Sequence, residues 1–488
     1  MEKKFEPNLK SVKKHRVPKW FHDAKFGIFI HWSLSSVPAF AVTGEGDITQ
    51  GLAKNGMKWH CINNPYAEWY LNTLRIKGSP TEKYHRENYG DDYPYENFAL
   101  EFNKAIEEWD PEGWADLFKE VGAGYVVLVT KHHDGFLLWP SSKPNPKKQN
   151  YHTQRDVVGE LTKAVKSRGM RMGFYYSGAL DWSFNEVPIT DAVSFLLNGP
   201  TRREYVEYVN YHFRELIDKY EPAILWNDIG YPPGTNVNKL FAYFYNKTPD
   251  GLVNDRWLQF PRKIRGIVKS WPVRNIIEFI AGIVIRKQGI EQKKPPHSDY
   301  ATPEYTSREN ISERKWESVR GIGNSFGYNR METESEYLDA DEAVRMLVDI
   351  VSKNGNLLLN IGPMADGTIP DGQLECIRGI GDWLEINGDA IYGTRPWIRA
   401  VGTTQNDTDI RFTRKGDILY AILLDTPEES EIVINNLRAA EKSTVTLLGN
   451  DSELEWSRQG VNLKISLPDN LPKSPVHALM ITPLPCRD

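Results

Sequence analysis

Cysteine is scarce in this sequence. Cys61, Cys376 and Cys486 are the three cysteines among 488 residues, and they lie far apart along the chain. An odd number at these spacings indicates neither a disulfide framework nor a zinc site. A reduced compartment suits such a chain, so we expect a cytoplasmic protein.

Long apolar runs and a strong charge bias are missing as well. The longest strongly apolar run, residues 276–285, is interrupted by Glu278 and is about half as long as a membrane span requires. The N-terminal M-E-K-K-F-E-P-N-L-K has no apolar core, so we expect no secretory signal. The 60 basic and 65 acidic residues leave a net charge of −5, which argues against a nucleic-acid partner. We expect no membrane partner either, and the sequence leaves a homo-oligomer open.

Aromatic residues, by contrast, are abundant. The chain has 15 Trp, 23 Tyr and 19 Phe, and 40% of all residues are hydrophobic. Such a composition supplies a sizeable core. Aromatic rings also line sugar-binding clefts, because the C–H face of a sugar packs against a ring.

Continuous apolar runs recur along the first 390 or so residues. The predicted strands are residues 26–32, 125–130, 171–176, 223–226, 251–253, 325–329 and 356–361. Continuous runs, rather than alternation, are typical of parallel strands covered on both faces. Helical patterns fall between them at residues 111–121, 156–167, 201–220 and 341–352. This alternation predicts an α/β fold, with a (β/α)8-type barrel over residues 1–392.

The pattern changes near residue 393. Short strand-like runs separated by turn residues follow at 409–414, 418–425, 431–434, 444–448, 463–467 and 478–482. They predict a small antiparallel β-sandwich over residues 393–488.

Residues 258–298 also differ from their surroundings, because they combine Ile and Val with many basic side chains. We interpret them as a surface insertion. The basic residues are Arg262, Lys263, Arg265, Lys269, Arg274, Arg286, Lys287, Lys293 and Lys294.

Polar residues follow several of the predicted strands directly. They are His31, His132, His133, Tyr175, Asp228 and Arg256. In a parallel barrel the C-terminal ends of the strands share one face, so these side chains are expected to converge on one pocket. Asp228 closes the buried run A-I-L-W-N-D and is the first candidate for chemistry. The alternative is that Asp228 only caps a following turn.

Two chemistries suit this set, and a sugar-binding protein without catalysis is a third reading. In the first, the histidines and Asp228 bind a metal ion in a barrel hydrolase. Against it, the first strand lacks an H-x-H pair, and adjacent His132 and His133 point to opposite sides of a strand. In the second, two carboxylates break a glycosidic bond. Asp228 is then the nucleophile, and its partner is Glu68, Glu304 or Glu317. Glu317 lies in an amphipathic stretch, which favours a solvated helix face.

Six motifs in this sequence resemble those of the α-L-fucosidases of glycoside hydrolase family 29. They are F-G-I-F-I-H-W (26–32) with S-V-P-A (36–39), K-H-H-D-G-F (131–136), Y-Y-S-G-x-L-D-W (175–182), L-W-N-D-I-G (225–230), G-I-G-N-S-F-G-Y-N (321–329) and N-L-L-L-N-I-G-P (356–363). The resemblance implies a barrel catalytic domain followed by a β-sandwich. It also implies retaining hydrolysis of terminal α-L-fucosides, without a cofactor or metal. The implied partner is a fucosylated oligosaccharide or other glycoside.

The resemblance also assigns roles to residues. It implies Asp228 as the nucleophile, which forms a covalent fucosyl-enzyme. It implies contacts to fucose hydroxyls from His31, Glu68, Trp69, His132, His133, Tyr175, Trp226 and Arg256, and an apolar wall for the fucose methyl group from Phe29 and Phe326. The match of T-P-E-Y (302–305) to the family's T-x-E-Y selects Glu304 as the acid/base. Residues 258–298 make the link before this motif longer than in the family, which leaves Glu68 and Glu317 open. Ser33 replaces the family's Gly after His-Trp.

Overall fold

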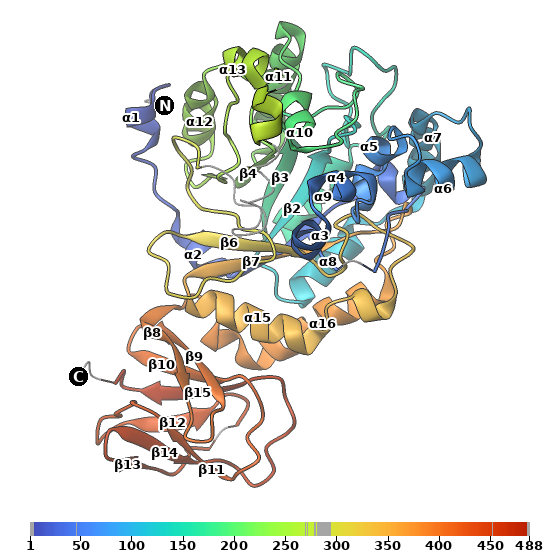
Figure 1. Cartoon of the computed structure of the whole chain (residues 1–488). Helices are drawn as coiled ribbons and strands as arrows, with labels where there is room; N and C mark the ends of the chain where they lie inside the picture. The colour runs from blue at the N-terminus through green and yellow to red at the C-terminus, as the bar shows by residue number, and fades with distance from the viewer. Residues whose placement is uncertain are drawn as a thin grey trace.

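Seven parallel strands form a curled sheet at the centre of the N-terminal domain (Figure 1). Their order is β5-β4-β3-β2-β1-β7-β6. The strands are β1 (Phe26–Ile30), β2 (Tyr125–Lys131), β3 (Arg171–Ser177), β4 (Ile224–Asp228), β5 (Leu252–Val253), β6 (Trp316–Gly321) and β7 (Gly355–Ile361). Every residue of β1, β2, β4 and β7 is buried, as the continuous apolar runs predicted. The barrel-type parallel sheet is confirmed.

The computed structural model describes residues 4–44, 46–268, 270, 272–277, 280, 294–450 and 452–485. Part of the apolar run 276–285, several basic residues of the 258–298 segment, among them Arg286 and Lys287, and Cys486 lie outside the described residues. Within the described ranges, no helix combines the length and the apolar character needed to cross a membrane.

Residues 299–305 occupy the position of an eighth strand between β5 and β6. On one side, the Asp299 amide donates to the carbonyl of Val253 at 3.0 Å. On the other side, Ala301 and Glu304 pair in parallel with β6. The backbone hydrogen bonding therefore continues from β5 to β6, and it brings Glu304 to the end of the barrel where the strands end.

Helices surround this sheet. They are α1 (Leu9–Val12), α2 (Lys19–Ala24), α3 (Ile48–Asn55), α4 (Met57–Ile62), α5 (Tyr70–Leu74), α6 (Pro80–Tyr89), α7 (Phe98–Ala105), α8 (Pro111–Glu120), α9 (Val157–Ser167), α10 (Ala192–Asn198), α11 (Arg203–Tyr220), α12 (Val237–Lys247), α13 (Arg262–Val268), α15 (Ala340–Ser352) and α16 (Asp371–Asn387). The four predicted helices correspond to α8, α9, α11 and α15. Their starts follow local chemistry: Asp110 caps α8 ahead of Pro111, and Asp156 caps α9.

Antiparallel strands form two sheets in the C-terminal domain. The larger has the order β12-β15-β10-β9-β8 and the smaller β11-β14-β13. The strands are β8 (Arg395–Thr403), β9 (Asp409–Lys415), β10 (Ile418–Leu423), β11 (Glu431–Ile434), β12 (Thr444–Leu447), β13 (Trp456–Gln459), β14 (Asn462–Ser466) and β15 (His477–Thr482). A core that includes Phe412, Ile434 and Leu463 is shared by both sheets. The antiparallel C-terminal domain is confirmed, whereas its boundary at residue 393 stays a prediction.

Helices α15 and α16 lie between the two domains (Figure 1). Asp349 of α15 accepts from Arg411 Nε of β9 at 2.6 Å, and Trp383 of α16 donates to the carbonyl of Val476 at 3.1 Å. These contacts join the C-terminal domain to helices on the outside of the barrel. The C-terminal domain therefore supports the barrel from the side.

The prediction for residues 316–329 is wrong in two respects. Residues 325–329 are not a strand, and the strand that precedes β7 is β6, which includes Glu317. Glu317 is completely buried rather than on a solvated helix face. Its carboxylate accepts from Tyr125 Oη at 2.6 Å and from Trp226 Nε1 at 3.2 Å. A charged residue inside the barrel broke the apolar pattern by which the other strands were found.

Glu317 makes stability depend on pH. Burial raises its pKa from 4.5 to about 7, although hydrogen bonds from Tyr125 and Trp226 oppose the shift. The folded state thus holds this proton more tightly than the unfolded state. Stability is therefore lost as pH rises from about 4.5 to about 7.

We predict that Glu317→Gln removes this loss, because the amide stays neutral and can still hydrogen-bond both partners. Between pH 4.5 and pH 8, the free energy of unfolding of the variant should rise relative to that of the wild type by on the order of 3 kcal/mol. Urea unfolding across this pH range measures the shift. Glu385→Gln at an exposed position is the control and should show none. A difference that does not vary with pH would contradict the assignment.

Candidate active site

A cavity of about 640 Å³ lies at the C-terminal ends of the barrel strands. The twelve residues to which the family resemblance assigns roles all line it. They are Phe29, His31, Glu68, Trp69, His132, His133, Tyr175, Trp226, Asp228, Arg256, Glu304 and Phe326. They come from strands β1, β3 and β4 and from the segments that follow β1, β2, β5 and β6, so the parallel topology brings them together.

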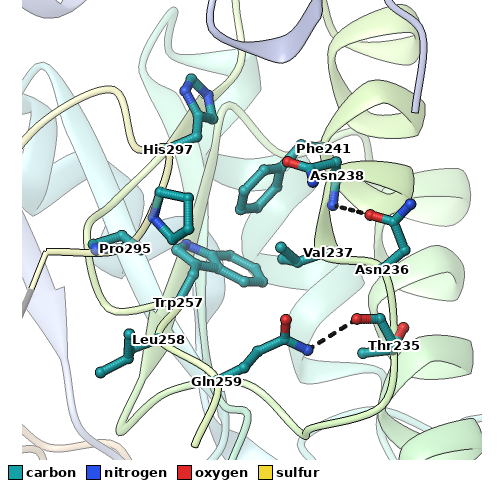
Figure 2. Close-up of a pocket in the computed structure, with 11 residues that line it drawn as sticks. Thr235, Asn236, Val237, Asn238, Phe241, Trp257, Leu258, Gln259, Pro295 and His297 are labelled. Carbon is teal, nitrogen blue, oxygen red and sulfur yellow. Dashed lines mark hydrogen bonds between the residues drawn. The ribbon is translucent and has the colours of Figure 1, made fainter. Parts of the chain in front are cut away.

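A second cavity, of about 260 Å³, lies outside the barrel between α12 and residues 257–259 (Figure 2). Trp257 and Phe241 face it, and the side chains of Asn236 and Gln259 are bonded within the protein. Asn236 caps α12, and Gln259 donates to the carbonyls of Pro232 and Thr235 at 2.9 and 3.0 Å. None of its lining residues is acidic. The larger cavity is therefore the candidate active site.

Asp228 ends β4 with its carboxylate in this cavity. Tyr175 Oη donates to its Oδ2 at 2.8 Å, and Arg256 Nη1 donates to its Oδ1 at 3.0 Å. Both carboxylate oxygens thus accept from side chains, and not from a following turn as the capping alternative required. Burial, with the charge of Asp228, raises the pKa of Tyr175 well above its usual value. Tyr175 therefore remains a donor that fixes the carboxylate.

Arg256 contacts both candidate catalytic carboxyls. Its Nη2 lies 2.5 Å from Glu304 Oε1, while Nη1 holds Asp228. Burial disfavours the cation, but the charges of Glu304 and Asp228 outweigh burial and raise the pKa of Arg256. The guanidinium also lies over the Trp226 ring, 4.6 Å from its centroid. One cation therefore fixes the relative positions of the two carboxyls.

Thr302 holds Arg256 from behind. Arg256 Nε donates to Thr302 Oγ1 at 3.1 Å, and Nη2 donates to the Thr302 carbonyl at 3.1 Å. Thr302 is itself fixed by Asp255, whose Oδ1 accepts from the Thr302 amide at 3.0 Å and from its hydroxyl at 2.7 Å. Residues 255–256 and 302–304 therefore form one hydrogen-bonded unit on either side of the long 258–298 segment.

Hydrogen bonds set the tautomers of two histidines. Asn360 donates to the Phe326 carbonyl through Nδ2 at 2.7 Å, so its Oδ1 faces His31 Nδ1 at 2.6 Å and accepts from it. Ser177 donates to the Leu180 carbonyl at 2.8 Å, so its oxygen accepts from His133 Nδ1 at 2.6 Å. In both rings Nε2 is left as an acceptor.

His132 completes this group with an unused polar atom. Its Nδ1 is buried and has no hydrogen-bond partner. Burial lowers the pKa of His31 to about 4 and holds the pKa values of His132 and His133 well below the usual value. The three rings are therefore neutral near pH 7, which suits hydroxyl groups rather than anions.

Aromatic rings form a further part of the cavity wall, next to His31. Phe29 packs edge-on against Phe326 with centroids 6.5 Å apart, and it contacts Trp226 at 5.2 Å. Trp226 in turn stacks on Tyr175 at 5.4 Å. Trp226 Nε1 donates to Glu317 inside the barrel, which holds the indole of this wall in place. Such a surface suits a C–H face or a methyl group.

The three candidate acid/base residues occupy different environments. Glu317 does not line the cavity, and both of its carboxylate oxygens have donors. Glu68 lines the cavity, and burial raises its pKa to about 7; its Oε2 accepts from the Gly327 amide at 2.8 Å. Glu304 lines the cavity beside Arg256 and Asp228. The geometry therefore removes Glu317 and leaves Glu304 and Glu68.

Sequence analysis missed the residues that orient the site. Asn360, Ser177, Thr302 and Ser325 contact His31, His133, Arg256 and Glu68, respectively. Asn360 carried a signal, since it is a polar residue inside the apolar run N-L-L-L-N-I. Ser177, Thr302 and Ser325 lie within the quoted motifs, but their residue type gave no role, because Ser and Thr are common after strands and in loops.

The metal-binding alternative requires a cluster of metal-ligating side chains. Across the described ranges of the chain, no group of three or more His, Cys, Asp and Glu side chains is arranged to hold a metal ion. Nδ1 of His31, Nδ1 of His133 and both carboxylate oxygens of Asp228 are instead engaged by Asn360, Ser177, Tyr175 and Arg256. The site is built around a buried guanidinium.

Comparisons with known proteins agree with the motifs. The family model of α-L-fucosidase matches residues 1–389, and that of the α-L-fucosidase C-terminal domain matches residues 404–482. Tissue α-L-fucosidase of Homo sapiens is 32% identical over 487 residues, which are 98% of this chain and 90% of that protein. An α-L-fucosidase of Dictyostelium discoideum is 30% identical over 490 residues, 98% of this chain and 92% of that one.

Solved structures give the same result. The α-fucosidase of Thermotoga maritima in complex with a mechanism-based inhibitor is 42% identical, with a TM-score of 0.82 over 98% of this chain and 99% of that one. A T. maritima α-L-fucosynthase in complex with α-L-Fuc-(1-2)-β-L-Fuc-N3 is 42% identical, with a TM-score of 0.84 over 99% and 100% of the two chains. This protein belongs to the α-L-fucosidase family, glycoside hydrolase family 29.

Proposed function

We propose that this protein hydrolyses terminal α-L-fucosides with retention of configuration, through a covalent fucosyl-enzyme on Asp228. The single observation that carries the proposal is the contact of Arg256 with both Asp228 and Glu304. Retaining glycosidases need their two carboxyls about 5–5.5 Å apart, whereas inverting ones need room for a water between them. Two carboxyls bound by one guanidinium favour the closer arrangement.

In the first step, Asp228 attacks the anomeric carbon, and its carboxylate forms a C–O bond as the bond to the leaving oxygen breaks. Glu304, protonated in the reactive complex, donates its proton to that oxygen. In the second step, Glu304 takes a proton from water, whose oxygen displaces Asp228 from the anomeric carbon. Two inversions at that carbon give overall retention.

The remaining side chains would bind the sugar itself. His31 and His133 each present Nε2 as an acceptor, and His133 Nε2 lies 4.0 Å from Asp228 Oδ2. A sugar hydroxyl held there would be close to the reacting carbon, where its hydrogen bonds can strengthen in the transition state. Glu68, Trp69, His132, Tyr175, Trp226 and Arg256 are proposed to share in binding the ring and its hydroxyls.

Fucose differs from most hexoses in carrying a methyl group in place of a hydroxymethyl group. The wall formed by Phe29 and Phe326 offers an apolar contact for it. The T. maritima relative has been solved in complex with fucose, which supports this sugar as the ligand. We therefore propose fucosylated oligosaccharides or other α-L-fucosides as substrates.

We predict that Asp228→Gly lowers the turnover of 4-nitrophenyl α-L-fucoside by at least about 10³-fold, because no nucleophile remains. Azide, which is small enough to enter the space left by the carboxylate, should restore turnover. It attacks from the face opposite the leaving group, so the product should be β-L-fucosyl azide, identified by NMR.

The control for this test is Asp250→Gly, at an exposed position away from the cavity, which should keep full activity. EDTA should leave the wild-type rate unchanged. Wild-type activity in Asp228→Gly would remove Asp228 from the mechanism. Loss of wild-type activity with EDTA would favour the metal-dependent alternative.

A second prediction separates Glu304 from Glu68. Glu304→Ala should lose about 10²- to 10⁴-fold in kcat toward fucosides with poor leaving groups and much less toward 2,4-dinitrophenyl α-L-fucoside, which needs no proton. Azide should then intercept the fucosyl-enzyme and give α-L-fucosyl azide, with retained configuration. Glu68→Ala should chiefly raise KM and show no azide product.

The same assays on both variants decide the outcome. If Glu68→Ala shows the leaving-group dependence and the retained azide product, the acid/base assignment passes from Glu304 to Glu68. Glu317→Gln is the matched control, and it should keep turnover within about tenfold because Glu317 lies outside the cavity.

A further inference from the structure

The 640 Å³ cavity continues beyond the proposed fucose position into an outer chamber. Helices α3, α4 and α10 form part of its wall, and another part is formed by Leu258, Phe260, Arg265, Ile277 and Ile280. Its lining is largely apolar and includes Leu52, Met57, Phe195, Leu196, Phe260 and Ile277. Most of these side chains are only partly buried. They form an apolar surface that the protein itself does not cover.

The outer chamber is continuous with the fucose-binding wall. Trp69 packs edge-on against His133 at 5.4 Å on one side and stacks on Phe195 of α10 at 6.4 Å on the other. Phe195 also joins an apolar cluster with Leu180 and Ile229, beside Asp228. A group attached to the anomeric carbon therefore reaches this surface directly.

Two arginines, Arg265 and Arg274, connect this part of the wall to α10. Arg265 of α13 donates to the carbonyl of Gly199 at 2.7 Å and to that of Leu197, at the C-terminal end of α10. Arg274 pairs with Asp191, the N-cap residue of α10. A cation near the last carbonyls of a helix is favourable, because it opposes the partial negative charge there. Helices α10 and α13 accordingly lie together in Figure 1.

These contacts give a purpose to part of the basic segment. Arg265 and Arg274 bind groups of α10 and of the residues next to it, so their charges are not evidence for an acidic ligand. The apolar side chains of the same segment, Phe260 and Ile277, then face the chamber. The segment combines both residue types because it must be held in place and also present an apolar surface.

We propose that the outer chamber is a leaving-group subsite that selects α-L-fucosides with an apolar aglycone, alkyl or aromatic. This inference rests on the proposed function. Buried strand residues, among them Phe29, Trp226 and Val319, line the inner end of the cavity, where we place the terminal sugar. The glycosidic oxygen must therefore point outward, and the aglycone must lie in the outer chamber.

A sugar as leaving group fits this surface less well. Most of its hydroxyls would face Leu, Ile, Met and Phe side chains, and buried hydroxyls without partners are costly. The guanidinium of Arg265 is already bonded to two carbonyls. An alkyl or aryl group instead gains from the apolar area that it covers.

A series of n-alkyl α-L-fucosides from methyl to hexyl tests the inference. The larger alkoxide leaving groups are almost equally basic, so the intrinsic reactivity of the glycosidic bond is nearly constant. Differences in kcat/KM then report contacts of the alkyl chain. For the wild type, kcat/KM should rise about two- to fourfold for each of the first added methylenes. In Phe260→Ser/Ile277→Ser the ratio of kcat/KM for hexyl to that for methyl should fall at least about tenfold. Leu196→Ser on α10 is an independent chamber variant.

Ile267→Ser is the matched control. Ile267 lies on α13 but is 60% exposed and does not line the cavity. This variant should keep both the activity and the chain-length dependence. Near-ultraviolet circular dichroism checks that each variant is folded.

Three outcomes overturn the inference while fucosidase activity stands. They are equal kcat/KM values for all alkyl fucosides, a higher value for fucosyl-(1→2)-lactose than for the hexyl fucoside, and an unchanged ratio in the folded chamber variants. If no fucoside is hydrolysed, the proposed function fails. In that event, calorimetric titration with methyl and hexyl 1-thio-α-L-fucosides tests the inference separately. Tighter binding of the hexyl compound supports an apolar subsite, and equal binding of the two compounds overturns it.

Discussion

The buried guanidinium of Arg256 connects the parts of the chain on which the active site depends. It contacts Asp228 at the end of β4 and Glu304 in the closing segment, and Thr302 holds it in place. Burying a cation is costly unless anions and hydrogen bonds compensate, and here every side of the group has a partner. Because a guanidinium is planar and its donors are fixed, it sets the orientation of two carboxyls at once. The spacing of the two carboxyls is thus a property of the folded apoprotein, before any sugar enters.

Neutral donors and acceptors surround this charged centre. The histidines are kept neutral by burial, and Asn360 and Ser177 determine which ring nitrogen of His31 and His133 faces the cavity. Close to the bond that would break, the charge in the cavity is therefore confined to the carboxyls and Arg256, whereas Arg265 lines the cavity farther along. Hydroxyl-binding atoms and aromatic rings line the same space, since His31 lies against Phe29 and Phe326. This combination matches a deoxysugar, which carries both hydroxyls and a methyl group.

Much of this arrangement could be predicted from the sequence. Buried parallel strands appear in it as continuous apolar runs, and the C-terminal ends of such strands share one face of a barrel. Asp228, His31 and Arg256 were found in this way. The same reasoning failed at β6, where Glu317 points inward and is stabilised by Tyr125 and Trp226. Those partners are about 190 and 90 residues away along the chain. The closing segment 299–305 was not foreseen either, since its strand-like pairing comes from neighbours and not from its own composition. Ser177 and Thr302 could be recognised only once their distant partners were known.

The bond between Asp255 and Thr302 has a consequence for how this family can diversify. The chain leaves the barrel wall after Arg256 and returns to it at Thr302, at points joined by hydrogen bonds from the Thr302 amide and hydroxyl. The excursion between them is closed at its base. Doubling the length of such a loop costs only about 0.6 kcal/mol of closure entropy. Insertions can therefore accumulate there and alter what surrounds the leaving group, while Glu304 keeps its register against β6.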